Sequence, residues 1–425
     1  MLILGIETSC DETAAAVVRD GCEILSNVVV SQIDIFAEYG GVIPEVAARS
    51  HLEVMMPVVD KALSDARCSW EDIDVIAVTH APGLLGSLLI GTLTARTLAI
   101  LHDKPLYAVH HLKSHVYANW LQPELNNRNS ISSTRSFAPV LGDRAAWLGK
   151  ASELAFLSLS CSVVTGLSRS SCSPLVANGL RDAISDCYDC ARLPSFPLIA
   201  LVISGGHTQI LYMREHNQFE IVGTTRDDAV GECFDKVAKI LGLPYPGGPS
   251  IARAADGVLP EEMLSKHNHT EVRPGDADKY NFPHPKVAGL DFSFSGLKTA
   301  VLRTVQKEVG VEISYPSHKL KDLLTPQQVA DFAASFQRAA VEILCEKLVK
   351  ALEKYPETQA VAVAGGVSAN QALRAALPEA YFPAPNLSGD NGAMVAAACY
   401  FEIMSGVKPT DPYKLNIYPR VSIEE

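Results

Sequence analysis

The sequence predicts an α/β protein built from two related lobes with a cleft between them. Three strand-like runs followed by a helix begin at residue 2, and the same order begins again near residue 197. In both places a polar turn joins the first two runs, at 8–13 and at 204–207. No repeat of about 20–50 residues is visible, which argues against a solenoid or a propeller. The two halves therefore indicate a duplicated α/β lobe.

The first half alternates strands and helices. Strands are expected at 2–7, 14–19, 23–30, 74–80 and 106–109, and helices at 45–65, 84–101 and 110–120. Asp20-Gly21 is a strong hairpin dipeptide between the second and third strands. Apolar residues at near-helical spacing support the helix over 45–65. Pro57 is expected to kink or split that helix, because proline lacks the N–H that a helix interior needs.

The second half repeats this order. Two strands within 197–213 surround Ser204–His207, a third strand covers 218–222, and 360–366 is a buried strand that ends in glycines. Helices are expected at 231–241, 293–308, 326–354 and from about 368. The helix over 326–354 is the clearest, because Thr325 suits its N-cap and Pro326 suits its first turn.

Residues 121–195 break the alternation of strands and helices. Serine-rich stretches alternate with apolar ones there without a sustained period, which predicts a poorly ordered insertion. Cys187 and Cys190 form a CxxC pair, but Cys161 and Cys172 are too far apart to supply the second pair of a zinc knuckle. We interpret these cysteines as incidental.

Composition and charge narrow the class of protein. The 425 residues are 48% apolar and 20% charged, which is typical of a soluble globular protein. The net charge of −12 excludes a polycation that grips nucleic acid by bulk charge. No uncharged apolar run reaches about 18 residues, and no basic segment precedes an apolar run at residue 1, so we expect neither a membrane span nor a signal peptide. Ten cysteines without such a leader favour reduced thiols and a cytoplasmic protein.

The two polar turns carry groups that suit contact with a phosphate or, in the first turn, with a metal-bound water. The first turn contains Asp11 and Glu12, and its alternative interpretation is an ordinary Asx hairpin. The second turn contains adjacent glycines, Gly205 and Gly206, whose backbone N–H groups can approach a phosphate. The chain has neither GxxxxGK[ST] nor GxGxxG, which argues against a P-loop or a Rossmann dinucleotide site.

A pair of histidines indicates a metal site. His111 and His115 lie four residues apart on an expected helix, so both imidazoles face the same side, although such spacing also arises by chance. A zinc protease would need Glu directly after the first histidine, where this chain has Leu112. Asp390, at an expected strand-to-helix turn, is the candidate third ligand, and its alternative role is an N-cap.

Three further positions suit a nucleoside. Asp235 lies on the helix over 231–241 and can accept hydrogen bonds from ribose, or it pairs with Lys239. Gly247-Gly248 is expected to form a turn after that helix. The segment AGGVSAN, which ends at Asn370, places glycines between a strand and a helix, so its backbone can approach a flat base.

The order of the motifs resembles one family. GIETSCDET, YGGVIPEVAARSH, HHLKSH, ISGGHT, GECFDKVAKILGLPYPGGPS, GLDFSFSGLKTA, AGGVSAN and DNGAM follow one another as in the tRNA N6-adenosine threonylcarbamoyltransferases, the TsaD family. The resemblance covers about 1–120 and 196–410. It implies an actin-like fold of the sugar kinase and Hsp70 type, with two βββαβαβα lobes. It also implies transfer of threonylcarbamoyl from its adenylate to N6 of adenosine 37 in tRNAs that read codons beginning with A.

The resemblance also implies roles for residues of this chain. Its divalent metal, iron in the first place and zinc as the alternative, falls on His111, His115 and Asp390. Substrate contacts fall on Val202, Ile203, Ser204, Gly205, Gly206, Asp235, Gly248 and Asn370. Asp11 and Glu12 lie in the first cleft loop, where either carboxylate is a candidate to accept the proton of the amine.

Domains and partners follow from the same resemblance. We expect an N-terminal lobe over 1–120 joined by a C-terminal helix at about 391–425, and a C-terminal lobe over 196–390. Bacterial relatives act with a TsaB-like scaffold paralogue and a TsaE-like P-loop ATPase, whereas organellar relatives act as homodimers. A local basic patch on Lys286, Lys298, Arg303 and Lys307 is expected to contact tRNA. The alternatives are an actin-like ATPase or kinase and a non-catalytic scaffold paralogue.

Overall fold

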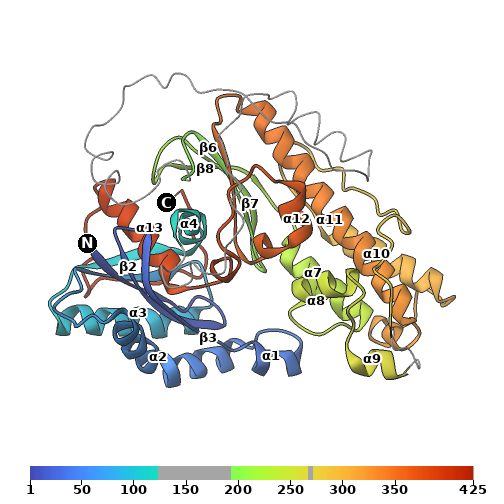
Figure 1. Cartoon of the computed structure of the whole chain (residues 1–425), viewed down its shortest axis with the longest axis horizontal. Helices are drawn as coiled ribbons and strands as arrows, with labels where there is room; N and C mark the ends of the chain where they lie inside the picture. The colour runs from blue at the N-terminus through green and yellow to red at the C-terminus, as the bar shows by residue number, and fades with distance from the viewer. Residues whose placement is uncertain (123–192, 267–270, 425) are drawn as a thin grey trace.

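A computed structural model describes residues 1–122, 193–266 and 271–424 and contains two mixed β-sheets. The first sheet has the strand order β3-β2-β1-β4-β5 (Figure 1). Its strands are β1 (Leu2–Glu7), β2 (Glu12–Arg19), β3 (Glu23–Ser31), β4 (Val75–Ala81) and β5 (Leu106–His110). β1, β2 and β3 pair antiparallel, whereas β4 pairs parallel to β1 and to β5. This agrees with the strands predicted for the first half.

The second sheet repeats the order of the first as β8-β7-β6-β9. Its strands are β6 (Leu198–Ile203), β7 (Thr208–Met213), β8 (Phe219–Thr224) and β9 (Ala360–Ala364). Tyr381 forms a parallel bridge to Ala362 of β9, at the place that β5 occupies in the first sheet. The repeated order confirms the predicted duplicated actin-like α/β fold.

The central strands are apolar because both of their faces are covered. Every residue of β6, LIALVI, is buried, and β1 is buried from Ile3 to Glu7. Strands of this kind show continuous apolar runs instead of alternation. Two four-residue turns project from the paired strands: the first turn, Thr8–Asp11, joins β1 to β2, and the second turn, Ser204–His207, joins β6 to β7.

Helices α1 (Ile33–Tyr39), α2 (Pro44–Ala66) and α3 (Leu85–Leu101) belong to the first half. α2 continues through Pro57, so the predicted split does not occur. The carbonyl group that loses its partner belongs to Glu53, one turn earlier, and both residues lie on the exposed side of the helix. Water can satisfy that carbonyl group there, which explains why the helix tolerates the proline.

Two helices lie between the sheets and bring their residues into one core. They are α4 (His111–Tyr117), which continues as a 3₁₀ turn (Ala118–Trp120), and α13 (Gly392–Met404) (Figure 1). A single apolar cluster contains residues of both helices and of β1, β2, β6 and β9. α13 approaches β1 closely, because a Cβ atom at Gly5 would lie 2.2 Å from the carbonyl oxygen of Gly392. The C-terminal helix is shorter than the 391–425 that the sequence predicted.

The remaining helices cover the second sheet or follow it. They are α7 (Val230–Leu241), α8 (Gly247–Ala255), α9 (Glu261–Lys266), α10 (Ser295–Glu308), α11 (Pro326–Lys354) and α12 (Gln371–Ala376), with 3₁₀ turns at Ser317–Asp322, Gly366–Ala369 and Pro385–Leu387. α11 begins with the predicted cap, since the Thr325 hydroxyl accepts from the N–H of Gln328. Gly247-Gly248 was expected to be a turn, but it forms the first residues of α8. No helix in the described ranges is long and apolar enough to cross a membrane.

Candidate active site

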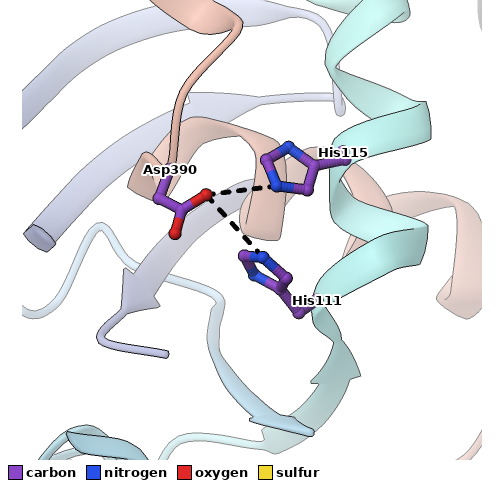
Figure 2. Close-up of side chains that lie close together, drawn as sticks. All are labelled: His111, His115 and Asp390. Carbon is purple, nitrogen blue, oxygen red and sulfur yellow. Dashed lines mark ion pairs between the residues drawn. The ribbon is translucent and has the colours of Figure 1, made fainter. Parts of the chain in front are cut away.

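His111, His115 and Asp390 converge between the two helices that the sheets enclose. Both histidines project from α4, and Asp390 projects from the loop before α13 (Figure 2). Asp390 Oδ1 lies 3.1 Å from Nε2 of His115 and 3.7 Å from Nε2 of His111. The three ligand atoms lie within 4.8 Å of one another, a set that could hold one metal ion. The spacing of the histidines on one helical turn produces this geometry.

Asp390 is available as a ligand because its neighbour caps the helix. The N-cap of α13 is Asn391, whose side-chain oxygen accepts from the N–H of Met394 at 3.0 Å. The alternative role of Asp390 as an N-cap is therefore wrong. Burial alone would raise the pKa of Asp390, but the neighbouring imidazoles His111 and His115 lower it to about 2. An ionised carboxylate beside two imidazoles is a donor set that suits iron or zinc.

The surroundings of His115 also suit a bound metal. Its side chain is buried, Nδ1 makes no hydrogen bond to any residue that the structure describes, and Nε2 faces Oδ1 of Asp390 at 3.1 Å. Buried polar atoms without partners are rare in proteins, and each calls for a ligand or another explanation. A cation held by Nε2 and by the carboxylate of Asp390 would pair with both groups.

Glu7 supports His111 from behind, and the sequence analysis missed it. The fully buried Glu7 places Oε2 3.2 Å from Nδ1 of His111, and the Thr79 hydroxyl donates to the same oxygen at 2.6 Å. A carboxylate only accepts, so Nδ1 of His111 carries a proton, and a ring that binds a metal would do so through the lone pair of Nε2. Burial lowers the pKa of His111, but Asp390 and Glu7 outweigh it and raise the pKa to about 9. An acid that ends an otherwise apolar buried strand was the available signal.

The first turn brings two further carboxylates toward this group. Asp11 is buried, and Glu12 is partly buried at the start of β2. The pKa of Glu12 is raised by burial first, then by the charges of Asp390 and Asp11. The electrostatic effect of Asp390 on Glu12 shows that the first turn and the metal ligands share one region.

The second turn is open where the first is packed. A Cβ atom added at Gly205 or at Gly206 would meet nothing within 4 Å, and both residues are exposed. The N–H of Ser204 donates to the carbonyl of His207, which closes the turn. Val202 and Ile203 differ from these residues, because their side chains are buried in the apolar cores. Only Ser204, Gly205 and Gly206 therefore present exposed groups of the predicted hairpin.

The three expected nucleoside contacts differ in how far they are already engaged by other groups of the protein. Asp235 Oδ1 accepts from the N–H of Gly247 at 2.7 Å, so this carboxylate fixes the start of α8. Gly248 faces open space. The amide of Asn370 already serves the protein, since it accepts from the N–H of Leu373 at 3.0 Å and donates to Gln337 at 2.8 Å.

Tyr245 feels the charges of one carboxylate in the first turn and one on α7. Its pKa is raised by burial first, and then by the charges of Asp11 and Asp235. Asp11 also raises the pKa of Asp235, after burial and other causes. A carboxylate of the first half and one of the second therefore lie near enough to interact. Of the expected nucleoside contacts, Asp235 therefore lies near Asp11 of the first turn.

Comparison with known proteins identifies the family. The model of the TsaD family, described as tRNA N6-adenosine threonylcarbamoyltransferase, matches residues 23–129 and 157–397. The break between these ranges falls in the predicted insertion, 121–195, nearly all of which lies outside the described residues. With its Cys187 and Cys190, that prediction is not tested by the structure.

Relatives of the same name match nearly the whole chain. One from Thermomicrobium roseum is 39% identical over 421 residues, covering 96% of this chain and 93% of its own. One from Bacillus cereus is 38% identical over 434 residues, covering 100% of this chain and 97% of its own. A solved activator of the 2-hydroxyisocaproyl-CoA dehydratase from Clostridium difficile covers 97% of this chain and 100% of its own, with 14% identity and a TM-score of 0.40. From the family model and the relatives, this chain belongs to the TsaD family of tRNA N6-adenosine threonylcarbamoyltransferases.

Proposed function

We propose that this enzyme transfers the threonylcarbamoyl group from threonylcarbamoyl-AMP to N6 of adenosine 37 in tRNAs that read codons beginning with A. Membership of the TsaD family carries the proposal. The convergence of His111, His115 and Asp390 supports it, because a catalytically silent paralogue would not need to keep the three ligands together.

The reaction needs an activated carbonyl, because the lone pair of the adenine amine is delocalised into the ring. N6 attacks the carbamoyl carbon, the bond from that carbon to the phosphate oxygen breaks, and AMP leaves with the electron pair. A metal bound to His111, His115 and Asp390 supplies Lewis acidity at this place. The exposed backbone N–H groups of Gly205 and Gly206 bind oxygens of the adenylate.

The proton of N6 goes to a carboxylate of the first turn, Asp11 or Glu12. The raised pKa of Glu12 favours this residue, because a carboxyl group with a higher pKa is the stronger base once ionised. Asp235, Gly248 and Asn370 hold the nucleoside part, with Asp235 using the oxygen that does not bond Gly247. We propose iron as the metal, with zinc as the alternative, because imidazole and carboxylate ligands suit both.

The partners we propose are a TsaB-like scaffold paralogue and a TsaE-like P-loop ATPase. Exposed apolar side chains on α2 and α3 support a protein partner: Leu52, Met56, Leu85, Leu89 and Leu93. We assign this face to the scaffold paralogue. Binding of such a paralogue should bury this face. The two proteins should therefore co-purify, and Leu89→Glu should abolish the association. A homodimer of this chain, detected by sedimentation, would contradict the assignment.

We propose that the basic residues in and near α10 contact tRNA. Lys298 lies 3.9 Å from Asp228, and Arg303 donates to Gln306 and to the carbonyl of Ile313, so both charges already have internal partners. Charge reversal at Lys286 and Lys307 should then weaken tRNA binding more than charge reversal at Lys298 and Arg303. Equal affinity of all variants across a salt series would contradict the patch.

The test of the function is transfer to tRNA by purified components. The chain is incubated with threonylcarbamoyl-AMP and unmodified tRNA, with and without TsaB-like and TsaE-like proteins, and the modified nucleoside is measured by mass spectrometry. We expect product with the wild type and none with the His111→Ala/His115→Ala variant. His318→Ala, an exposed histidine far along the chain, is the matched control. Absence of product under every wild-type condition would overturn the proposal.

A further inference from the structure

His51 is a buried histidine that the proposed reaction does not use. It lies on α2, and its exposed fraction is 0%. Its neighbours on the helix, Leu52 and Glu53, are exposed. A buried polar side chain must be hydrogen-bonded to be tolerated, so its partners reveal its role. Those partners belong to the segment that carries Asp11 and Glu12.

The contacts of His51 assign its protonation. Nε2 lies 2.9 Å from the carbonyl oxygen of Cys10, which can only accept, so Nε2 carries the proton. Nδ1 then offers a lone pair and accepts from the hydroxyl of Thr13 at 2.7 Å. Gln32 Nε2 lies 3.4 Å from the same nitrogen. Burial lowers the pKa of His51, although Cys10, Glu7 and Asp11 oppose this, which agrees with a neutral ring.

The ring therefore bridges the two residues that flank the carboxylates. Cys10 precedes Asp11, and Thr13 follows Glu12. Two other groups hold the same backbone: the Ser87 hydroxyl donates to the carbonyl of Cys10 at 3.2 Å, and the N–H of Gln32 donates to the carbonyl of Asp11 at 3.0 Å. These bonds hold the carbonyl groups of Cys10 and Asp11, while the side chain of Glu12 accepts separately from the Ser31 hydroxyl at 3.2 Å.

We propose that His51 is a positioning residue that fixes Asp11 and Glu12 for proton transfer. The inference rests on the proposed function, because it assumes that one of these carboxylates accepts the proton of N6. Without the ring, the carbonyl of Cys10 keeps only the Ser87 hydroxyl, and the Thr13 hydroxyl loses its acceptor. A displacement of the carboxylates by about 1 Å is enough to lower the rate of a positioned reaction about 100-fold.

The test compares His51→Ala with His51→Gln. A glutamine amide can reach the position of Nε2 and donate to Cys10, so it should restore part of what alanine loses. We expect His51→Ala to lower kcat between about 10-fold and 100-fold, whereas KM for the adenylate and the metal content remain at wild-type levels. His51→Gln should recover a measurable part of kcat. Ser26→Ala is the matched control, because Ser26 is buried in the same sheet and its hydroxyl oxygen accepts from the backbone N–H of Val17 at 3.2 Å, away from the turn.

A second readout does not depend on activity. Hydrogen exchange of the amides in a peptide covering 8–14 should rise in His51→Ala and stay at the wild-type level in Ser26→Ala. Unchanged exchange and unchanged kcat in a folded His51→Ala protein would overturn the inference. Equal losses in His51→Ala and Ser26→Ala would also overturn it, because they would show a general effect on stability. If the wild type forms no product but the exchange behaves as expected, the proposed function fails and the anchoring of the segment stands.

Discussion

The two turns at the candidate active site occupy equivalent places in their sheets, but they differ in their hydrogen bonds to the rest of the protein. The first turn, Thr8–Asp11, is bonded at every residue: Thr8 donates to Ser87, Ser9 accepts from Leu84, and His51 and Gln32 hold the next two carbonyls. The second turn, Ser204–His207, bonds mainly to itself and to Gly231 at the start of α7, and its glycines face open space.

The difference shows how a duplicated lobe acquires two tasks. A turn whose successive carbonyl groups are hydrogen-bonded can hold acidic side chains in fixed positions, which proton transfer and the support of a metal ligand require. In the second turn the exposed residues are glycines. Because no side chain covers their backbone N–H groups, an anion can approach these groups closely. The metal ligands lie near these two turns. Because the turns differ in their hydrogen bonding, we expect substitutions in the two turns to impair different functions of the site.

The largest effect should come from the metal ligands themselves. Each of His111→Ala, His115→Ala and Asp390→Ala should remove most of the bound metal and reduce transfer to background. Metal analysis by inductively coupled plasma spectrometry and nucleoside mass spectrometry check the two results. Because α4 and α13 pack through other residues of the shared core, the far-ultraviolet circular dichroism should stay that of the wild type. Full metal content in the histidine double variant would contradict the site.

Substitutions in the second turn should have the next largest effect, and this effect should be confined to the binding of the adenylate. Gly206→Val adds a side chain where a Cβ meets nothing within 4 Å, so the fold should keep its melting temperature. The added atoms would occupy the space of the ligand, and we expect the Kd for the adenylate to rise at least about 10-fold, the equivalent of about 1.4 kcal/mol. Calorimetric titration measures this Kd. Wild-type affinity in Gly206→Val would show that the adenylate binds elsewhere.

Glu7, the last residue of β1 before the first turn, should act through the metal instead of through the adenylate. Glu7→Gln keeps the size of the side chain but removes the charge that fixes the proton of His111. Loss of a carboxylate behind a metal-bound histidine typically costs 10-fold to about 100-fold in metal affinity. Competition with a chelator of known affinity measures the change, and Ser26→Ala serves again as the control. Metal affinity equal to the wild type would mean that the Ser9 hydroxyl, which lies 3.2 Å from Nδ1 of His111, suffices to orient the ring.

The sequence indicated the strands and the paired histidines because both depend on local patterns. Continuous apolar runs predict buried strands, and a spacing of four predicts one helical face. Glu7 was missed because its role depends on Thr79 in the neighbouring strand and on His111 in α4, which only the tertiary fold brings together. Gly247 was misread for a similar reason. A Cβ there would lie 2.5 Å from the Cα of Asp235, so the glycine serves a close approach of two helices and not a turn.

The smallest expected effect lies far from both turns and tests whether pH acts on the site or on the fold. His284 bonds Glu342 at 3.2 Å and Glu346 at 3.3 Å. The bond with Glu342 is the main cause that raises the pKa of His284 above 6.5. Burial opposes the ionisation of Glu342, but His284 lowers its pKa below 4.5, and Lys350 and His284 do the same for Glu346.

A raised histidine pKa stabilises the fold below 6.5 and loses this effect as the pH rises through the folded pKa. The lowered carboxyl pKa values stabilise the fold above 4.5. His284→Gln should therefore lower the free energy of unfolding most between these two values and least near pH 8. The melting temperature should change by less than about 2 °C, since the groups are partly exposed. Urea denaturation at a series of pH values measures the effect, whereas transfer activity and metal content should stay unchanged. A pH-independent difference from the wild type would show that His284 acts by packing and not by its charge.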